Sequence, residues 1–331
     1  MHCELVVPAL LASREIPRLP ALELLLARGR AEHRDTGSLE DWLADAFAID
    51  ERPFAAGALS IHASGAENDR ACLWMRADPV HLRLGHDRPT LVPAAGFGIT
   101  QAEADHFAAS LNAHFGGERT FVAVRPGQWC ARPAFEGEFD SVAPLNLAGQ
   151  AVDAQLREGR GAARRDAFLN EIQMALHDHP ANLAREARGE PAVNSLWLWG
   201  FGKLPDSAHA DWHSITTNEP LAEGLARLAG MRSMRLPAGA AEWLERAPED
   251  GKHLILLEEL RAALALGGDE AHAGRLAGLE ARWFAPLLDA LRAGRVGMVT
   301  FHVPDAGASW ETVRTDLRRF WRRARPLGAF A

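Results

Sequence analysis

The hydrophobic and polar positions at the start of the chain predict a strand followed by helices. Glu4–Leu11 is a run of aliphatic and β-branched residues typical of a buried strand. A turn that contains prolines follows, and Ala21–Arg28 has the pattern of a helix that ends at Gly29. Leu39–Phe47 is a second amphipathic segment. A strand, a loop and a helix in this order are how an α/β sheet begins.

The middle of the chain has shorter apolar runs bounded by glycine and proline. These runs, which predict strands, are Cys72–Arg76, His81–Leu84 and Thr120–Val124. Between them the pattern predicts a helix that starts at Thr100, because Glu103 three residues later completes a capping box. Together these segments predict a small α+β unit inserted into the main sheet.

The second half of the chain alternates between the hydrophobic pattern of helices and that of strands. Helices are predicted at Ala162–His177, Leu221–Leu228, Ala241–Leu244, Leu276–Ala293 and Trp310–Arg325. Strands are predicted at Ser195–Trp199, His253–Leu257 and Val296–Val303. Strands that alternate with helices favour a mostly parallel sheet with helices on both faces, so we expect an α/β fold.

Composition narrows the classes of function. The 331 residues suit one large or two modest domains, and 47% hydrophobic with 24% charged residues is a globular balance. A net charge of −8 argues against a dedicated nucleic-acid or anionic-membrane binder, which would be basic overall. The apolar run Leu5–Ala12 is too short for a membrane span and lacks the basic start of a signal peptide, so we expect a cytoplasmic protein. The three cysteines show no zinc or disulfide spacing.

The most specific motif lies between Pro144 and Pro205. A His-Pro-x-Asn turn leads through an arginine-containing helix and a Gly-x-Pro-x-x-Asn segment into NSLWLWGFG. This order resembles the archaeal-type branch of the cofactor-independent phosphoglycerate mutases. The matching positions are His179, Pro180, Asn182, Arg185, Gly189, Pro191, Asn194, Trp197, Trp199, Gly200 and Gly202.

Weaker similarity at Leu19–Gly29 and Leu221–Pro237 extends the resemblance over nearly the whole chain. Bacterial RpfE-type regulatory proteins, which are phosphoglycerate mutase-like, look closer still. The resemblance implies a core like that of the alkaline phosphatase superfamily, with an inserted smaller α+β domain. We expect the core at residues 1–58 and 188–331, and the inserted domain at 59–187.

The chemistry implied by the resemblance needs residues that this chain lacks. Such enzymes hold two divalent metals with Asp and His around a Ser or Thr nucleophile. Pro8-Ala9-Leu10 stands where the first Asp belongs, and Ala71–Pro79 offers no Ser or Thr at the nucleophile's place. The family's Thr-Asp-Pro-His motif corresponds to Ala143-Pro144-Leu145, without the Asp and the His.

Two alignments compete for the next pair of ligands. One uses Asp269 and His272, at a spacing one residue short; the other places the pair within Glu259–Leu264, where no Asp or His occurs. We favour the second, because ligands in such sheets cluster at strand ends, and His272 is then a surface residue of a helix. His302 remains as a weak metal candidate, so we expect no cofactor, although a divalent metal stays conceivable.

The resemblance also points to binding residues near the tryptophan-rich strand. Candidates for a small phosphorylated or anionic ligand are Asn194, Trp197, Trp199, Gly200, Gly202, Lys203 and Arg185. The alternative is that the tryptophans fill the core and the arginines lie on solvated helix faces. The predicted last helix carries six arginines with Phe320 and Trp321, which fits a docked helix with a basic outer face, or contact with a nucleic acid, a protein partner or an anionic surface.

Three hypotheses about function follow. We favour a catalytically degenerate phosphoglycerate mutase-like protein with a regulatory or small-anion-binding role. The alternatives are an active metal-dependent phosphotransferase with displaced ligands, and a protein-interaction module with a vestigial pocket.

Overall fold

The chain forms two compact units in the computed structural model. The structure describes residues 1–13, 16–33, 35, 37–51, 54–65, 70–84, 88–117, 119–132, 142–150, 152, 162–248 and 250–330. The first unit comprises Met1–Ala48 and Ala208–Ala331, and the second comprises Ile49–Ser207. The boundaries expected from the sequence, after residue 58 and before residue 188, both fall inside the second unit.

The first unit is built on a mostly parallel sheet. Its strands are β1 (His2–Val6), β2 (Arg30–His33), β8 (Ser214–Thr216), β9 (Arg232–Met234), β10 (Lys252–Leu256), β11 (Met298–Val303) and β12 (Ala308–Val313). In the described part of the unit they lie in the order β2-β12-β11-β1-β10-β8-β9. Neighbours from β11 to β9 run parallel, whereas β12 and β2 add an antiparallel edge. This arrangement confirms the expected α/β class.

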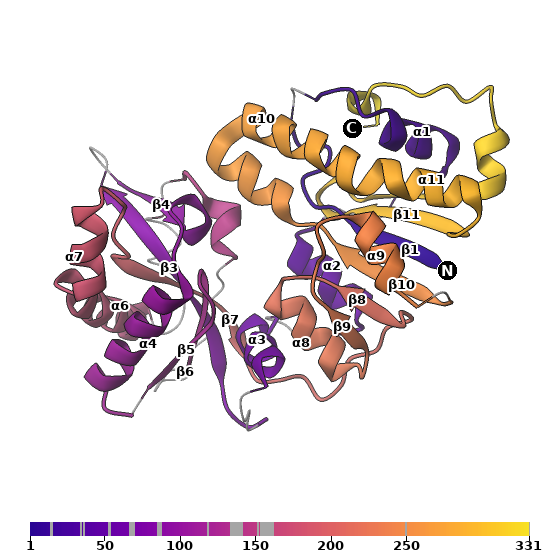
Figure 1. Ribbon diagram of the computed structural model, residues 1–331. Coiled ribbons are helices and arrows are strands. Elements are labelled where there is room, and N and C mark those ends of the chain that lie inside the picture. The colour runs from indigo at the N-terminus through magenta and orange to yellow at the C-terminus, as the bar shows by residue number, and fades with distance from the viewer. Residues whose placement is uncertain are drawn as a thin grey trace. The chain divides into compact units, whose positions relative to one another are not determined.

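Helices cover both faces of this sheet (Figure 1). One face carries α1 (Pro20–Arg28), α9 (Ala240–Arg246), α10 (Glu259–Leu279), a π-helical segment (Glu280–Phe284) and α11 (Ala285–Ala293). The other face carries α2 (Leu39–Ala46) and α8 (Pro220–Leu228). No helix in the described ranges is both long enough and apolar enough to cross a membrane.

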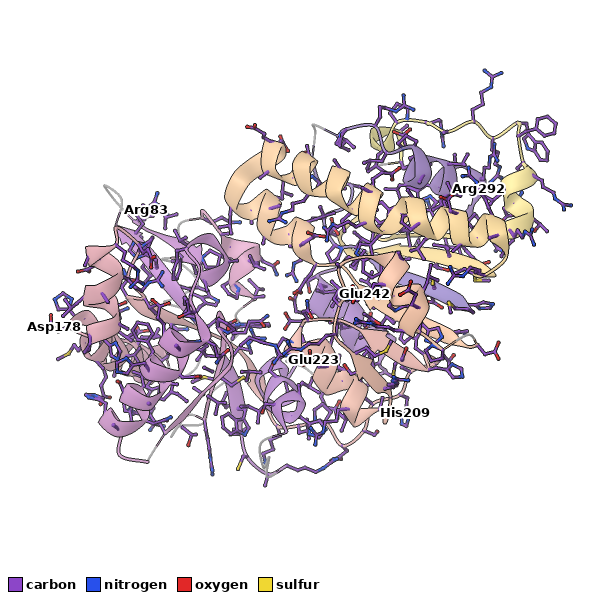
Figure 2. The ribbon with its side chains drawn as sticks, viewed as in Figure 1. Arg83, Asp178, His209, Glu223, Glu242 and Arg292 are labelled. Carbon is purple, nitrogen blue, oxygen red and sulfur yellow. The ribbon has the colours of Figure 1, made fainter. Side chains whose placement is uncertain are left out.

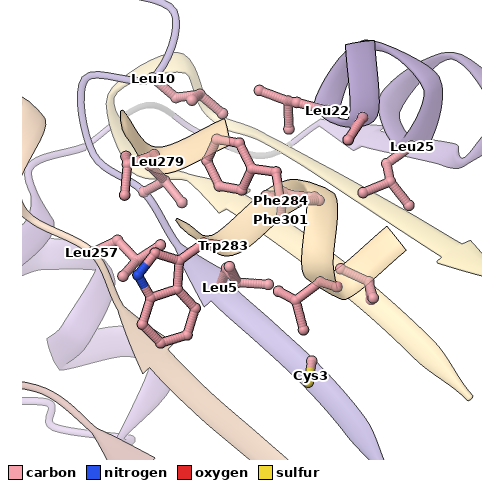
Figure 3. Packing of buried hydrophobic residues seen from close by; sticks show 14 of the residues in the cluster. Cys3, Leu5, Leu10, Leu22, Leu25, Leu257, Leu279, Trp283, Phe284 and Phe301 are labelled. Atoms are coloured by element: carbon pink, nitrogen blue, oxygen red, sulfur yellow. The ribbon is translucent and has the colours of Figure 1, made fainter. Parts of the chain in front are cut away.

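Alternation along β1 decides which side chains meet the main core and which face the opposite side. Cys3 and Leu5 point into a cluster that contains Trp283 and Phe301, both fully buried (Figure 3). Glu4 therefore lies on the face opposite this core. Burial of a large aromatic or aliphatic side chain contributes about 1.5–3 kcal/mol, so this cluster holds the sheet and its helical layer together.

The π-helical segment also completes the start of α1. That helix has no side-chain cap of its own. The carboxylate of Glu280 instead accepts hydrogen bonds from the backbone N–H groups of Ala21, at 2.6 Å, and Leu22, at 3.2 Å. A negative charge at a helix N-terminus is stabilising because the N–H groups there have no partner within the helix. Glu280 thus ties α1 to the π-helical segment, which lies on the same face of the sheet.

The structure corrects the prediction for the C-terminal segment. The helix expected at Trp310–Arg325 is absent from the described residues there, and its first part is strand β12. Inward and outward positions alternate along β12, which is the period of a strand and not of a helix. A 3₁₀ turn at Arg314–Arg318 follows, and Phe320 and Trp321 beyond it are exposed. A helix here would have had few apolar side chains to bury.

The second unit holds an antiparallel sheet. Its strands are β3 (Trp74–Leu84), β4 (Pro89–Pro93), β5 (Thr120–Arg125), β6 (Gln128–Arg132) and β7 (Ser195–Gly202). Its helices are α3 (Ala56–Ser64), α4 (Gln101–His114), α6 (Ala162–His177) and α7 (Pro180–Ala187). The capping box predicted at Thr100 and Glu103 is present at the start of α4. The two short strands predicted before residue 85 are one continuous strand, β3.

The tryptophan-rich strand β7 belongs to this second sheet and not to the parallel sheet. It pairs antiparallel with β3, so that Trp197 lies opposite Asp78 and Trp199 opposite Arg76. The strand itself is confirmed, but its apolar sequence fits either sheet, and pairing with β3 is a contact between segments far apart in the sequence. Its place in the core sheet is therefore an expectation that the structure corrects.

A buried ion pair lies beneath β7. The guanidinium of Arg76 is 2.9 Å from the carboxylate of Asp78, and both side chains are almost fully buried. The same carboxylate accepts hydrogen bonds from the Trp199 indole at 2.7 Å and from the Trp129 backbone at 3.0 Å. Because Arg76 donates through two nitrogens, the Asp78 carboxylate accepts from four donors in all. The ion pair therefore joins three segments of the second unit.

Replacement of Asp78 by Ala should therefore destabilise the second unit severely. A buried guanidinium that loses its carboxylate partner costs about 3–5 kcal/mol. Urea denaturation followed by circular dichroism measures the change. The control is Arg292→Ala, which removes an exposed pair with Asp289 and should cost less than about 1 kcal/mol. Equal losses in the two variants would contradict this role for Asp78.

Candidate functional site

Charged side chains gather at the carboxyl ends of the parallel strands of the first unit. Glu219 begins α8 just after β8, and Glu258 follows β10. Glu40 comes from α2, and Arg261 from the first turn of α10. Ligands and catalytic groups of open α/β sheets lie at this edge. This group of four, the strand-end cluster, is the candidate functional site.

Arg261 is the positive centre of the strand-end cluster. Its guanidinium lies 3.0 Å from the carboxylate of Glu40, and both side chains are largely buried. Burial acts to lower the pKa of Arg261, but the negative charges of Glu40 and Glu258 outweigh it and raise the pKa above its usual value. The guanidinium is therefore permanently charged and neutralises the carboxylates around it.

The carboxyl groups of Glu219 and Glu258 lie close together in the strand-end cluster. Burial, followed by the neighbouring charge of Glu219, raises the pKa of Glu258 to about 8. Two close carboxylates cannot both ionise without strong repulsion, so one keeps its proton. At neutral pH Glu258 is accordingly a hydrogen-bond donor.

The loop after β1 is held by side chains from the neighbouring elements. The Ala9 N–H donates to Asp305 at 2.8 Å, and the Ala9 carbonyl lies 2.7 Å from Nε2 of His272. The Ser13 hydroxyl donates to Asp269 at 2.6 Å. The expectation that His272 is a surface residue is wrong, because the side chain is fully buried. The backbone carbonyl of the loop provides the polar partner that makes this burial possible.

A cleft of about 1130 Å³ lies within the same unit, and Glu4 and His302 are among its lining residues. Nε2 of His302 is 3.0 Å from the carboxylate of Glu4. The rings of Trp42 and His302 are 5.2 Å apart, and those of Trp42 and Trp212 are 6.1 Å apart. His209, labelled in Figure 2, is an exposed residue of the lining. The cleft thus combines an aromatic wall with an imidazole–carboxylate pair.

The charges of this cleft are mainly negative. Its carboxylates are those of Glu4, Asp35, Asp41, Asp45 and Asp211, and its ammonium group is that of Lys252. Burial acts to raise the pKa of Glu4, but hydrogen bonds and charge from His302, with a hydrogen bond from Trp212, hold it below its usual value. Glu4 is therefore ionised at neutral pH. A lining of this kind repels phosphate groups.

The donor set does not fit the pair of divalent metals that the resemblance implies. Across the described ranges of the chain, no three His, Cys, Asp or Glu side chains are grouped as a metal ion would need. His302 bonds to the carboxylate of Glu4, and the guanidinium of Arg261 already pairs with a carboxylate of the strand-end cluster. No chemical step can be assigned to metals held by these residues.

The predicted binding residues all lie in the second unit, and most have partners within it. Asn194 accepts from the Leu82 N–H at 2.7 Å and donates to the Leu82 carbonyl at 2.9 Å. The Trp197 indole donates to the Val142 carbonyl at 2.9 Å. Lys203 is exposed. A binding role for these residues, and for Trp199, stays a prediction.

Gly200 and Gly202 have a packing role that the sequence did not show. A Cβ on Gly200 would lie 2.5 Å from the Cβ of Ala56, and one on Gly202 would lie 2.7 Å from that of Ala55. Gly200 also has a φ of +60°, which favours glycine. The glycines therefore let α3 approach β7 closely. A ligand's approach to this backbone remains a prediction.

Arg185 is a structural tie between segments. Its side chain is 1% exposed and donates to the carbonyls of Pro191, at 2.9 Å, and Gly98, at 2.7 Å. It also lies 3.2 Å from the carboxylate of Glu103. These donors are used within the chain, so binding of a phosphate by Arg185 would require them to be released.

Comparison with known proteins supports the resemblance read from the sequence. A probable 2,3-bisphosphoglycerate-independent phosphoglycerate mutase from Geobacter sulfurreducens is 32% identical over 126 residues, which are 37% of this chain and 31% of that relative. The enzyme of that name from Methanosarcina barkeri is 24% identical over 173 residues, which are 49% of this chain and 42% of the relative. This chain resembles 2,3-bisphosphoglycerate-independent phosphoglycerate mutases.

The matches span less than half the length of these curated relatives. The PH0037 protein from Pyrococcus horikoshii shares the fold, with a TM-score of 0.57 and 14% identity over 94% of this chain and 87% of that one. No protein-family model matches the chain.

The strand-end cluster was missed by reasoning from the sequence. That reasoning sought Asp and His, and passed over Glu219 and Glu258, which lie within three residues of the ends of β8 and β10. Glu258 comes just after the predicted strand His253–Leu257, which was a signal for that residue, whereas β8 was not predicted and Glu219 had no such signal. Glu40 and Arg261 carry no such signal, because 221 positions separate them.

Replacement of Glu258 by Gln should change how stability depends on pH. The free energy of unfolding of the wild type should fall as pH rises from about 4.5 to about 8, because the unfolded chain releases a proton that the folded chain keeps. Gln keeps the neutral hydrogen-bonding form and has no proton to release, so this fall should disappear. Urea denaturation at a series of pH values measures it.

The control for that experiment is Glu259→Gln, whose carboxylate pairs with Arg282 at 2.7 Å. It should keep the fall in stability seen in the wild type. An unchanged pH dependence in the Glu258 variant would show that this group titrates normally.

Proposed function

We propose that this chain is a phosphoglycerate mutase-like protein without two-metal phosphoryl transfer, and that it serves a regulatory or ligand-binding role. The observation that carries the proposal is the guanidinium of Arg261 within the strand-end cluster. A two-metal mechanism needs exchangeable cations that clamp the attacking and leaving oxygens of the substrate. A covalently attached guanidinium supplies positive charge at this edge, but it offers no open coordination position.

The sequence around the first unit supports the same proposal. Pro8-Ala9-Leu10 gives no carboxylate at the end of β1, and the Ala9 N–H is already bonded to Asp305. The loop is thus stabilised by the chain's own side chains. The polar groups of this loop already have partners within the chain. This supports a role in stability or ligand binding and not in holding exchangeable metal ions.

The cleft near Glu4 and His302 supports binding of a small molecule that does not carry a phosphate group. Its volume of about 1130 Å³ is slightly above the roughly 300–1,000 Å³ typical of small-molecule sites. Its negative lining disfavours the phosphorylated ligand expected from the resemblance. A small anion would therefore have to bind elsewhere on the chain.

The test replaces Arg261 by Met, which keeps the length of the side chain and removes its charge. In the wild type, Mn²⁺ should leave the melting temperature unchanged, and 3-phosphoglycerate should not be converted. The variant leaves the cluster carboxylates without their cation, so it should be less stable. Mn²⁺ should restore part of that stability, by about 2.7 kcal/mol at roughly 100 times its dissociation constant.

The matched control is Arg275→Met on the same helix, whose guanidinium is mostly exposed and 3.6 Å from Glu259. It should be nearly as stable as the wild type and indifferent to Mn²⁺. Mn²⁺-dependent conversion of 3-phosphoglycerate by the wild type, lost in Glu258→Gln, would overturn the proposal. Indifference of the Arg261 variant to Mn²⁺ would show that the guanidinium does not take a cation's place.

A further inference from the structure

Arginine side chains and aromatic rings line a second cleft of the first unit, formed where the chain leaves β12. Its volume is about 890 Å³, and its lining includes Arg319, Trp321, Arg322, Arg323 and Arg325. Residues from the end of α1 and from β2 form another part of the wall. This basic cleft is separate from the strand-end cluster and shares only His33 with the cleft that contains His302.

Two of the arginines hold the segment of residues 319–325 against the end of α1. Arg319 donates to the Arg28 carbonyl at 3.0 Å, and Arg322 donates to the Gly29 carbonyl at 2.8 Å. These bonds join the segment to the last residues of α1, where carbonyl groups have no partner within the helix. The wall of the cleft is therefore held by backbone groups of the chain.

The remaining charge is available to a ligand. Arg319 pairs with Asp316 at 2.8 Å. Within the described parts of the chain, no carboxylate lies within ion-pair distance of Arg322, Arg323 or Arg325. Three guanidinium groups around one cleft create a positive potential that favours an anion, although that of Arg325 also lies 4.9 Å from the centre of the Phe330 ring. This local charge is opposite in sign to the net charge of −8.

The aromatic side chains provide the second half of the argument. Trp321 is 67% exposed and its neighbour Phe320 is 78% exposed, although large aromatic rings normally contribute burial. Of these two, Trp321 lines the cleft. An exposed indole beside guanidinium groups offers a flat face on which a flat ring can stack.

We propose that the basic cleft binds a nucleoside phosphate, with the base on Trp321 and the phosphate on Arg323 and Arg325. Guanidinium groups bind phosphate through paired hydrogen bonds, and aromatic rings stack on bases. The volume suits one nucleotide. This chemistry is offered by a free nucleotide and by a single-stranded nucleic acid, which the experiment distinguishes. The proposal does not rest on the absence of phosphoryl transfer.

The experiment measures fluorescence anisotropy with the full chain and two probes, a fluorescently labelled adenosine diphosphate and a labelled ten-residue oligothymidylate. Trp321→Ala should weaken binding about tenfold, because one stacked base contributes about 1–3 kcal/mol. Arg323→Ala should weaken it and reduce its dependence on salt. Both side chains are exposed, so the variants should keep the wild-type melting temperature.

The control is a distant arginine. Arg292→Ala, on α11 and labelled in Figure 2, should bind the probes as the wild type does. Pyrophosphate should compete more weakly than adenosine diphosphate, because it has no ring to stack.

Equal affinity for the two probes identifies a free nucleotide as the ligand, and much tighter binding of the oligothymidylate identifies a single strand. Either result supports the proposal if Trp321→Ala also weakens binding of the probe. Absence of binding by both probes, or binding that Trp321→Ala and Arg323→Ala leave unchanged, would overturn it.

Discussion

Carboxyl groups at the ends of the parallel strands lie close enough to repel one another, and the guanidinium of Arg261 offsets that repulsion. The edge of the sheet depends on this balance of charge. It brings α2 onto the start of α10, and it leaves Glu258 protonated beside Glu219. A metal-dependent enzyme would balance the same kind of carboxylates with cations from solution. Here the positive charge is part of the chain, so the fold keeps its edge whatever ions are present.

The central strands β1, β10 and β11 of the first unit and its helices α1, α2, α8 and α9 were predictable from the sequence, whereas β2, β8 and most of α10 were not. The parallel strands β10 and β11 are short apolar runs between glycines and helices, and the capping box at Thr100 marks a helix by local chemistry alone. Local signals of this kind need no knowledge of partners. The prediction for the C-terminal strand β12 was wrong, because its last residues and the six arginines after it were assigned together to one helix.

The candidate site was less predictable, because it consists of contacts between distant segments. Glu4 and His302 lie 298 positions apart, and the partner of His272 is a backbone carbonyl that no side-chain pattern reveals. The tryptophan-rich strand also shows that a sequence motif does not reveal which contacts its side chains make. Its motif is specific for the resemblance, but the side chains that the motif names bond within the second unit. A motif can thus record an ancestry while its residues serve packing.

The position of β1 between β10 and β11 has a consequence for the order in which the chain can fold. β1 is synthesised well before β10 and β11, the two strands that pair with it. The cap of α1 by Glu280 likewise spans 259 positions. The second unit, in contrast, is one continuous stretch, Ile49–Ser207. During synthesis it can complete its sheet while β1 still waits exposed, so the apolar N-terminal strand is the segment most in need of protection from aggregation.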